Sequence, residues 1–149
     1  MPDLTIRTRE TFTSGISGEA LAFDKTQTIT GVNRVQKMLF QPAVTGQTEI
    51  IRFQALEDGA GRFKVADFKY LRITNFDSTN AIEIYFSDSS TNHYFAIQLN
   101  AGCSYIMTSL GYDVRDNGLA SGVSAAELDL IEINSLVAAC DVEVIVAQA

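Results

Sequence analysis

The sequence predicts an all-β fold, an antiparallel two-sheet β-sandwich with a jelly-roll-like topology and an extended N-terminal arm. Three observations lead to this prediction. Short runs alternate apolar and polar residues with a period of two, turns rich in Gly, Asn, Asp and Ser separate them, and hardly any segment has a helical period. About eight or nine such runs are present, a number typical of a sandwich.

The clearest strands lie in the centre of the chain. The runs 69–75 and 81–87 alternate apolar with polar residues, and the sequence Asp-Ser-Thr-Asn at 77–80 joins them. Short Asp and Asn side chains bond to nearby backbone groups, which predicts a turn here, and Gly102 supplies a positive φ for the next turn. The core predicted from the alternating faces comprises Leu71, Ile73, Ile82, Ile84, Phe86, Phe95, Ile97, Leu99, Leu128, Leu130, Val142, Val144 and Val146.

Two further strands are predicted before this centre. Residues 28–40 are enriched in Thr and Val and contain Gly31, which favours a bent strand over a helix, and Pro42 ends it. Residues 49–55 form the next strand, which a turn with two glycines follows. The chain up to the centre is therefore expected to consist of strands joined by short turns.

The last part of the chain begins with an irregular segment, 110–124, which predicts a long loop. The pattern Ser-x-x-Glu at 124–127 has the form of a capping box and predicts a single helical turn. Residues 128–133 and 142–146 alternate again and predict the last two strands.

Residues 1–27 differ from the rest because their few large apolar side chains are irregularly spaced. We expect an arm that lies along a partner or adds an edge strand to a neighbouring subunit, with a flexible tail as the alternative. Residues 28–149 are then a single sandwich domain that folds alone. The candidate partner-binding residues of the arm are Leu4, Ile6, Phe12, Ile16, Leu21 and Phe23.

Charge is unevenly distributed along the chain. The formal net charge is −7, of which residues 1–48 contribute +1 and residues 49–149 contribute −8. An acidic surface repels phosphate, so direct binding of nucleic acid is not expected. No apolar run approaches the roughly 18 residues of a membrane helix, and the N-terminus lacks the order of a signal peptide. We therefore expect a soluble protein without a membrane partner.

The sequence offers little for catalysis or metal binding. His93 is the only histidine and no nucleophile motif accompanies it, so we do not expect an enzyme; a jelly-roll enzyme using His93 is a weaker alternative. Cys103 and Cys140 are too few for a zinc site, and they are interpreted as core residues, with a disulfide between them as the alternative. The acidic turns at 57–59 and 113–118 suit calcium or simple solvation. No cofactor is expected.

A sugar-binding module is another function that sandwiches perform. Such modules stack sugars on exposed aromatic rings, and this chain has no Trp. Its tyrosines at 85, 94, 105 and 112 are candidates for a weaker platform or for half-buried sheet residues.

The runs 70–75, 77–80, 82–87, 95–99 and 101–102 together carry a resemblance. Residues 69–108 resemble small β-sandwich virion proteins of tailed bacteriophages, in which a strand ending in Thr-Asn or Arg-Asn, a polar turn and a strand leading to Leu-x-x-Gly recur. The resemblance implies a structural virion protein, foremost a capsid decoration (cement) protein that binds and stabilises the assembled shell of the major capsid protein. A head–tail or tail component is the alternative.

The same resemblance implies where the protein acts and with what. Its partners would be the major capsid protein or other virion proteins, and its location the capsid surface, after assembly in the host cytoplasm. A homo-oligomer is expected, with a trimer favoured, because an arm without a sheet of its own needs a partner edge.

Overall fold

The computed structural model describes residues 2–13, 20–54, 59–88, 93–108 and 129–149. These residues fold as an all-β protein, and the one helical element among them is the short 3-10 turn η1 (Val65–Asp67). No helix in this part of the chain is long and apolar enough to cross a membrane. The capping-box turn expected at 124–127 lies outside the described residues.

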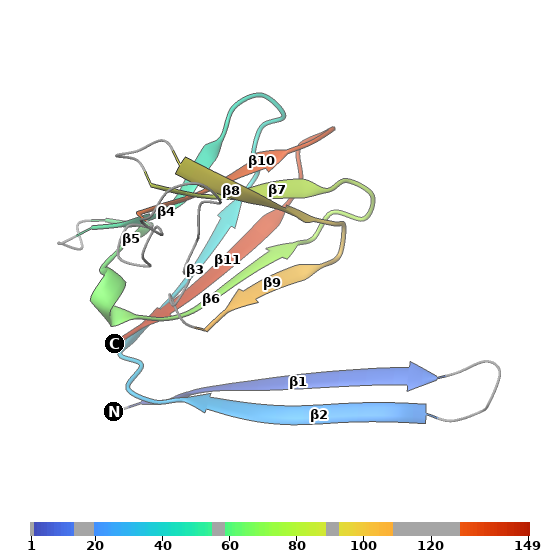
Figure 1. Cartoon of the computed structure of the whole chain (residues 1–149), viewed down its shortest axis with the longest axis vertical. Helices are drawn as coiled ribbons and strands as arrows, with labels where there is room; N and C mark the ends of the chain where they lie inside the picture. Colours follow the sequence, from blue (N-terminus) through green and yellow to red (C-terminus); the bar gives the residue numbers. More distant parts are fainter. Residues whose placement is uncertain (1, 14–19, 55–58, 89–92, 109–128) are drawn as a thin grey trace, which may run out of the picture.

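The described strands form three sheets (Figure 1). A two-stranded sheet, called the hairpin below, consists of β1 (Leu4–Thr13) and β2 (Ala20–Ile29). The five-stranded sheet has the order β5 (Arg62–Phe63), β4 (Thr48–Phe53), β10 (Leu130–Ser135), β7 (Ile82–Asp88) and β8 (His93–Leu99). The four-stranded sheet has the order β3 (Arg34–Phe40), β11 (Val142–Gln148), β6 (Phe68–Asn75) and β9 (Ser104–Met107).

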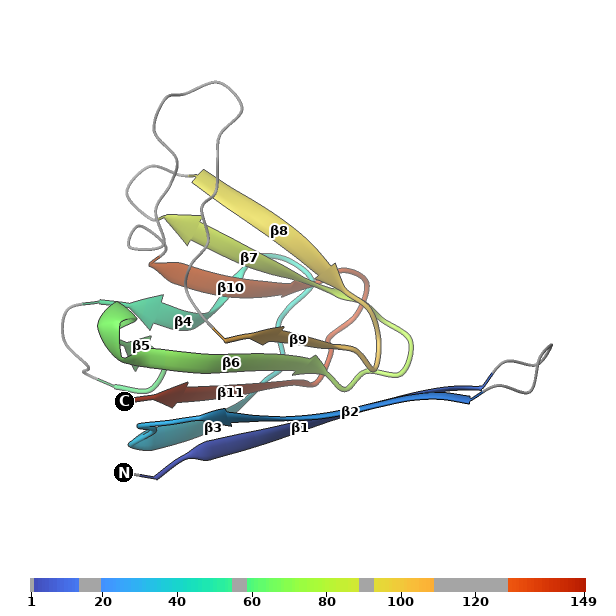
Figure 2. The same cartoon turned by 60° about the horizontal axis from the view of Figure 1, so that its bottom comes forward.

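The five- and four-stranded sheets, called the body below, share one hydrophobic core. Phe63, Ile84 and Ile131 enter it from the first sheet, and Leu71 and Val144 enter it from the second, all fully buried. In Figures 1 and 2 the two sheets lie as two layers, which is a sandwich-like arrangement. Neighbouring strands pair antiparallel, except that the short β5 pairs parallel with β4.

Most of the predicted core is confirmed. Phe95 and Ile97 are only partly buried but pack against the core, and Leu128 lies outside the described residues. The remaining predicted residues are buried, namely Leu71, Ile73, Ile82, Ile84, Phe86, Leu99, Leu130, Val142, Val144 and Val146. The alternation seen in the sequence is thus the alternation between the core and the outer faces of the sheets.

The sequence predicted that Leu130 faces the core from β10, and this prediction is wrong. The core cluster contains Ile131 and Ile133, whereas Leu130 is buried outside it. Two adjacent apolar residues fit either register, and pairing with β7 decides between them because it sets Ile131 opposite the core residue Phe86. A bulge follows Ile131 in the pairing with β4.

The single bent strand predicted over 28–40 is also wrong. The chain forms two strands there, since β2 ends at Ile29 and β3 begins at Arg34. Gly31 lies between them with φ of 70°, a left-handed conformation that suits glycine and interrupts a strand. At this point the chain passes from the hairpin into the body.

The predicted turn at 77–80 is present with the expected bonds. The Asp77 carboxylate accepts the backbone N–H groups of Thr79 and Asn80 at 2.7 and 2.6 Å. These bonds from Asn80 and Thr79 lower the pKa of Asp77. The side chain of Asn75 is buried beneath the turn and donates to the carbonyls of Asn80 and Leu99 at 2.9 and 3.3 Å. Local polar bonds therefore fix this β6–β7 connection.

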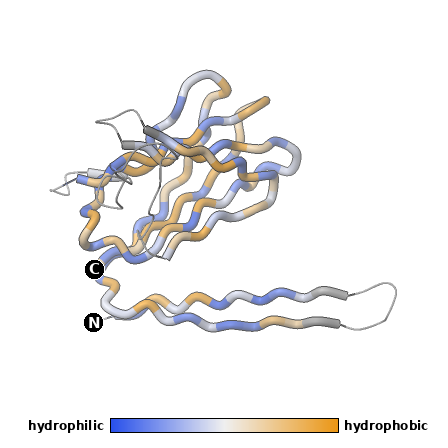
Figure 3. Tube along the Cα trace, viewed as in Figure 1, coloured by the Kyte–Doolittle hydropathy of each residue, from blue (hydrophilic) through white to orange (hydrophobic). Residues whose placement is uncertain are grey.

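The hairpin is a separate sheet that is not paired with the strands of the body. Its strands pair along their whole length, from Leu4 opposite Ile29 to Thr13 opposite Ala20, and no other described strand pairs with them. Its far end projects beyond the body in both views (Figures 1 and 2). Figure 3 shows hydrophobic residues throughout the body strands, whereas hydrophilic residues occupy much of the hairpin away from its root.

Candidate functional site

One face of the four-stranded sheet points away from the core and carries apolar and charged side chains. The valines of β11 enter the core, so the alternate residues of that strand point outward. The strand registers set their cross-strand neighbours on the same side. This outer sheet face comprises Val35, Lys37, Leu39, Tyr70, Arg72, Thr74, Ser104, Ile106, Glu143, Ile145 and Ala147.

The root of the hairpin covers one end of the outer sheet face. Tyr70 and Ala147 are buried there in a small cluster with Val32. The backbone N–H of Val32 donates to the carbonyl of Pro2 at 3.0 Å, which ties the start of the chain to the entry into the body. Burial raises the pKa of Tyr70. The partly buried residues that pack against this root cluster are Leu4, Ile6, Ile29 and Ile145.

A charged cluster follows along the same face. Glu143 forms ion pairs with Lys37 and with Arg72, whose guanidinium lies 2.7 Å from its carboxylate. These two side chains cover the carboxylate, which is only 5% exposed although it lies on the outside of the sheet. The hydrogen bond from Lys37, joined by that from Arg72, lowers the pKa of Glu143 against the opposing effect of desolvation.

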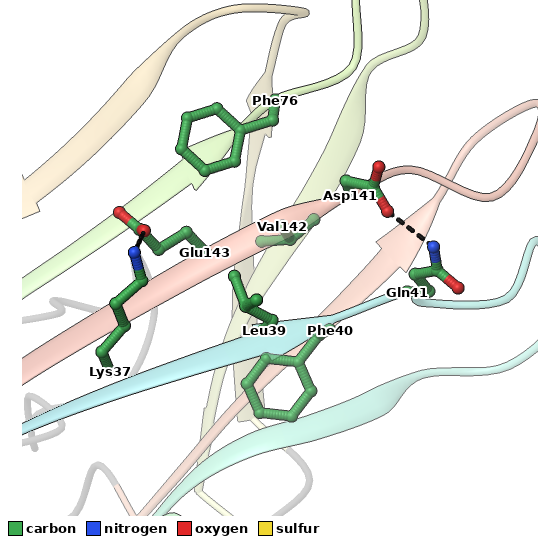
Figure 4. Close-up of a pocket in the computed structure, with 8 residues that line it drawn as sticks. All are labelled: Lys37, Leu39, Phe40, Gln41, Phe76, Asp141, Val142 and Glu143. Carbon is green, nitrogen blue, oxygen red and sulfur yellow. Dashed lines mark hydrogen bonds and ion pairs between the residues drawn. The ribbon is translucent and has the colours of Figure 1, made fainter.

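Beyond the charges lies an open groove of about 700 Å³ (Figure 4). Leu39 and Phe76 lie on the two sides of β11 and are 72% and 57% exposed. Asp141 accepts a hydrogen bond from Gln41 at 2.6 Å and limits the groove at one end. Lys37 and Glu143 line it at the other end (Figure 4). The groove therefore combines apolar sides with charged ends.

The hairpin has one polar and one more apolar face. On the polar face Arg7 pairs with Asp24 at 2.9 Å, and this bond lowers the pKa of Asp24. The other face carries Leu4 and Ile6 at the root and, farther out, Phe23 opposite Glu10. Phe23 is 50% exposed. The face that docks on the body at one end thus continues as a free surface with an aromatic residue.

The structure separates the predicted partner-binding residues. Leu4 and Ile6 pack against the body, whereas Phe23 is exposed on the free part of the hairpin. Phe12 and Leu21 are paired across the hairpin in the backbone register, but their side chains lie outside the described residues, as does the whole of Ile16. Among the described candidates, only Phe23 is open to a partner.

Leu39 and Phe76 were not predicted from the sequence. One signal for the first exists, since Met38, Leu39 and Phe40 are consecutive apolar residues in a strand. In a sheet such a run must direct at least one apolar side chain outward. Phe76 has no comparable signal, because its exposure follows from the way the chain turns after β6.

Two of the four tyrosines considered for a sugar platform lie together on the five-stranded sheet. Tyr85 and Tyr94, on β7 and β8, have ring centroids 6.0 Å apart, and Tyr94 is 69% exposed. The hydroxyl of Tyr85 donates to Glu83, and this bond raises the pKa of Tyr85. Tyr105 instead packs on Phe86 at the edge of the core. Tyr112 lies outside the described residues.

Most of the residues considered for chemistry lie outside the described part of the chain. His93 begins β8 opposite Asp88 in the backbone register, and its side chain lies outside the described residues, as do most of both acidic turns. Among the described residues no three of His, Cys, Asp and Glu gather as a metal site would require.

The two cysteines have different environments, and both are free. Cys140 is buried in the core, as predicted, but Cys103 is exposed, so the prediction of a core position is wrong for it. The difference arises because Cys103 belongs to the turn at Gly102, whereas Cys140 leads into the central strand β11.

Comparison of the chain with protein-family models, with curated proteins and with solved structures finds no match.

Proposed function

We propose that the body is a jelly-roll sandwich. Its eight longer strands, β3 to β11 without β5, can be numbered one to eight along the chain. The four-stranded sheet then has the order one, eight, three, six, and the five-stranded sheet contains the order two, seven, four, five. This interleaving of two Greek keys is the topology of jelly rolls, a fold used by viral capsid proteins and by lectins.

We propose further that the protein is a structural virion protein of a tailed bacteriophage, namely a capsid decoration protein. It would bind the assembled shell of the major capsid protein and stabilise it. The observation that carries this proposal is the hairpin, which projects from the body and exposes a polar face with Arg7 and Asp24. An isolated two-stranded hairpin is only marginally stable in water, so a partner surface is needed to order it fully. The resemblance of residues 69–108 to phage virion proteins supports a capsid shell as the assembly.

The experiment uses a protein with a shortened hairpin. Residues 8–25 are replaced by Asn-Gly, which joins Arg7 to Thr26, the residue opposite it in the register, through a two-residue turn. The root contacts of Leu4, Ile6 and Ile29 remain in this variant. Purified intact and shortened proteins are each mixed with phage heads that lack the protein and sedimented. We expect the intact protein to co-sediment in high copy number and the shortened protein to remain in solution.

The outcomes separate the proposal from its alternatives. If neither protein binds heads, the capsid function is wrong. If both bind equally, the hairpin is not the attachment device. A head–tail or tail component is the alternative within the same class, and labelling of particles with antibody distinguishes it. A decoration protein is found over the whole head, whereas a neck or tail component is found at one vertex or along the tail.

A sugar-binding module is the second candidate function, and one observation favours it. Tyr85 and Tyr94 lie side by side on the outer side of the five-stranded sheet, with one ring largely exposed. Rings on a flat sheet surface can stack on sugars, and Glu83 beside them can accept hydrogen bonds from hydroxyl groups. Screening on a glycan array tests this candidate. It predicts binding that Tyr94→Ala abolishes and that the exposed, distant Val137→Ala leaves unchanged.

A further inference from the structure

The docked and free parts of the hairpin belong to one continuous face. Leu4 is paired with Ile29 at the root, and Glu10 is paired with Phe23 six residues farther along the same strand. Residues separated by an even number of positions share a face, so Phe23 lies on the face that already contacts the body through Leu4 and Ile29. Phe23, farther out on this face, belongs to neither core cluster of the body and is 50% exposed.

The outer sheet face is likewise covered only in part. Its end around Tyr70 and Ala147 accepts the hairpin root. Its remainder exposes Leu39, and Phe76 faces the groove beside it (Figure 4). The protein therefore has two apolar surfaces that are each covered only at the hairpin root. One is the face of the hairpin with Phe23, and the other is the outer sheet face with Leu39.

Both apolar surfaces have charged side chains of both signs beside them. Phe23 has Glu10 opposite it across the hairpin and Lys25 two residues away on the same face. The groove carries the ion pair of Lys37 with Glu143 at one end and Asp141 at the other. A hairpin laid over the groove brings Lys25 and Glu10 to a surface lined by two acidic side chains and one basic one.

The exposure of its apolar side chain Phe23 directs the hairpin to a second molecule. Ten extended residues span about 33 Å, whereas the seven residues of β11 span about 23 Å. The hairpin therefore extends past its own sheet, as Figures 1 and 2 show. In the single chain Phe23, Leu39 and Phe76 all stay exposed, so the hairpin does not fill its own groove.

We propose that the hairpin of one copy lies on the outer sheet face of a second copy, with Phe23 inserted between Leu39 and Phe76. This contact joins two different surfaces, so repeated around an axis it closes a ring such as the expected trimer. It goes beyond the decoration function, because it identifies a second copy of this chain as the partner of the hairpin's apolar face. The polar face with Arg7 and Asp24 stays outward and remains free for the shell.

A cysteine-pairing experiment tests the contact between copies. Cys103, which is exposed, is first changed to Ser, and Cys140 is buried and stays. Phe23→Cys is introduced into one protein and Leu39→Cys into another, and the two are mixed under mild oxidation. A disulfide needs Cα atoms within about 7 Å, so only a direct contact links them. The matched control replaces Leu39→Cys with Val137→Cys, which has the same exposure, 72%.

We expect covalent heterodimers in the mixture with Leu39→Cys and none in the control mixture. Absence of heterodimers, or an equal yield in both mixtures, overturns the proposal. A single protein carrying both Phe23→Cys and Leu39→Cys provides a further test. If its disulfide forms within one chain and the protein remains a monomer on a non-reducing gel, the hairpin folds back on its own sheet and the proposal is wrong.

Light scattering measures the strength of the same contact. Truncating a central aromatic anchor typically weakens association by about 30-fold, and we expect this for Phe23→Ala but not for Val137→Ala. A wild-type protein that is monomeric at micromolar concentration contradicts the inference. If the protein forms oligomers but does not bind phage heads, only the proposed capsid function is wrong. If a monomer binds phage heads, only the proposed contact between the hairpin of one copy and the sheet of another is wrong.

Discussion

The body and the hairpin are built from the same kind of alternating strand but differ in what surrounds them. The body strands form two sheets that pack face to face, so Ile84 on β7 and Val144 on β11 are completely buried between them. In the described part of the hairpin, Leu4, Ile6 and Ile29 pack on the body at the root, whereas Phe23 remains half exposed. A period of two therefore specifies which residues share a face, while a second layer decides whether that face becomes a core. Replacements in the two regions should have very different effects, which the following experiments measure.

The largest effect is expected in the core. Changing Ile84→Ala removes a fully buried side chain and leaves a cavity, which should cost about 2–5 kcal/mol in the free energy of unfolding. Denaturant unfolding measures this loss. Ile106→Ala, on an exposed position of the four-stranded sheet, is the control and should change stability by less than about 0.5 kcal/mol. Equal effects at both sites would mean that the strand register is wrong.

The next effect concerns the turn that joins the two layers of the body. Asn75 is fully buried, and Asn75→Ala removes its hydrogen bonds to the carbonyls of Asn80 and Leu99. Loss of these bonds should cost about 1–3 kcal/mol, again measured by denaturant unfolding. Asn100→Ala is the matched control because Asn100 is exposed and bonds to Gln98. A stability loss no larger than the control's would show that the turn forms without Asn75.

Removal of the hairpin should have an intermediate effect that depends on how much is removed. Deleting residues 1–27 uncovers Tyr70 and Ala147, which are buried beneath the hairpin root. We expect a loss of about 1–2 kcal/mol from the exposed apolar area, so the body does not fold alone at full stability. The shortened hairpin keeps the root and should lose less than about 0.5 kcal/mol. Thermal unfolding of both proteins at dilute concentration compares them, and equal losses would contradict the role of the root.

The smallest effect is expected at the surface of the sheet and depends on pH. The ion pairs lower the pKa of Glu143, so the charged form stabilises the fold above the ordinary value of 4.5. This contribution is lost as the pH falls through the lower value of the folded state. The difference in melting temperature between the wild type and Glu143→Gln should therefore shrink below about pH 4. A difference that stays constant between about pH 3 and pH 7 would show that the ion pairs contribute nothing.

Local chemistry explains what could be predicted from the sequence alone. The alternation in β6, β7 and β11, the turn held by Asp77 and the positive φ of Gly102 depend only on residues close together in the chain. For this reason the all-β class and most of the core were predictable.

Tertiary structure decided the features that depend on distant partners. The outward face of Leu130 was set by the pairing of β10 with β7. The groove joins Leu39 of β3 and Phe76 after β6 across β11, three segments that are far apart in the sequence. A periodic pattern contains no information on which strand lies beside which, because that choice depends on how the two sheets bury their shared apolar surface.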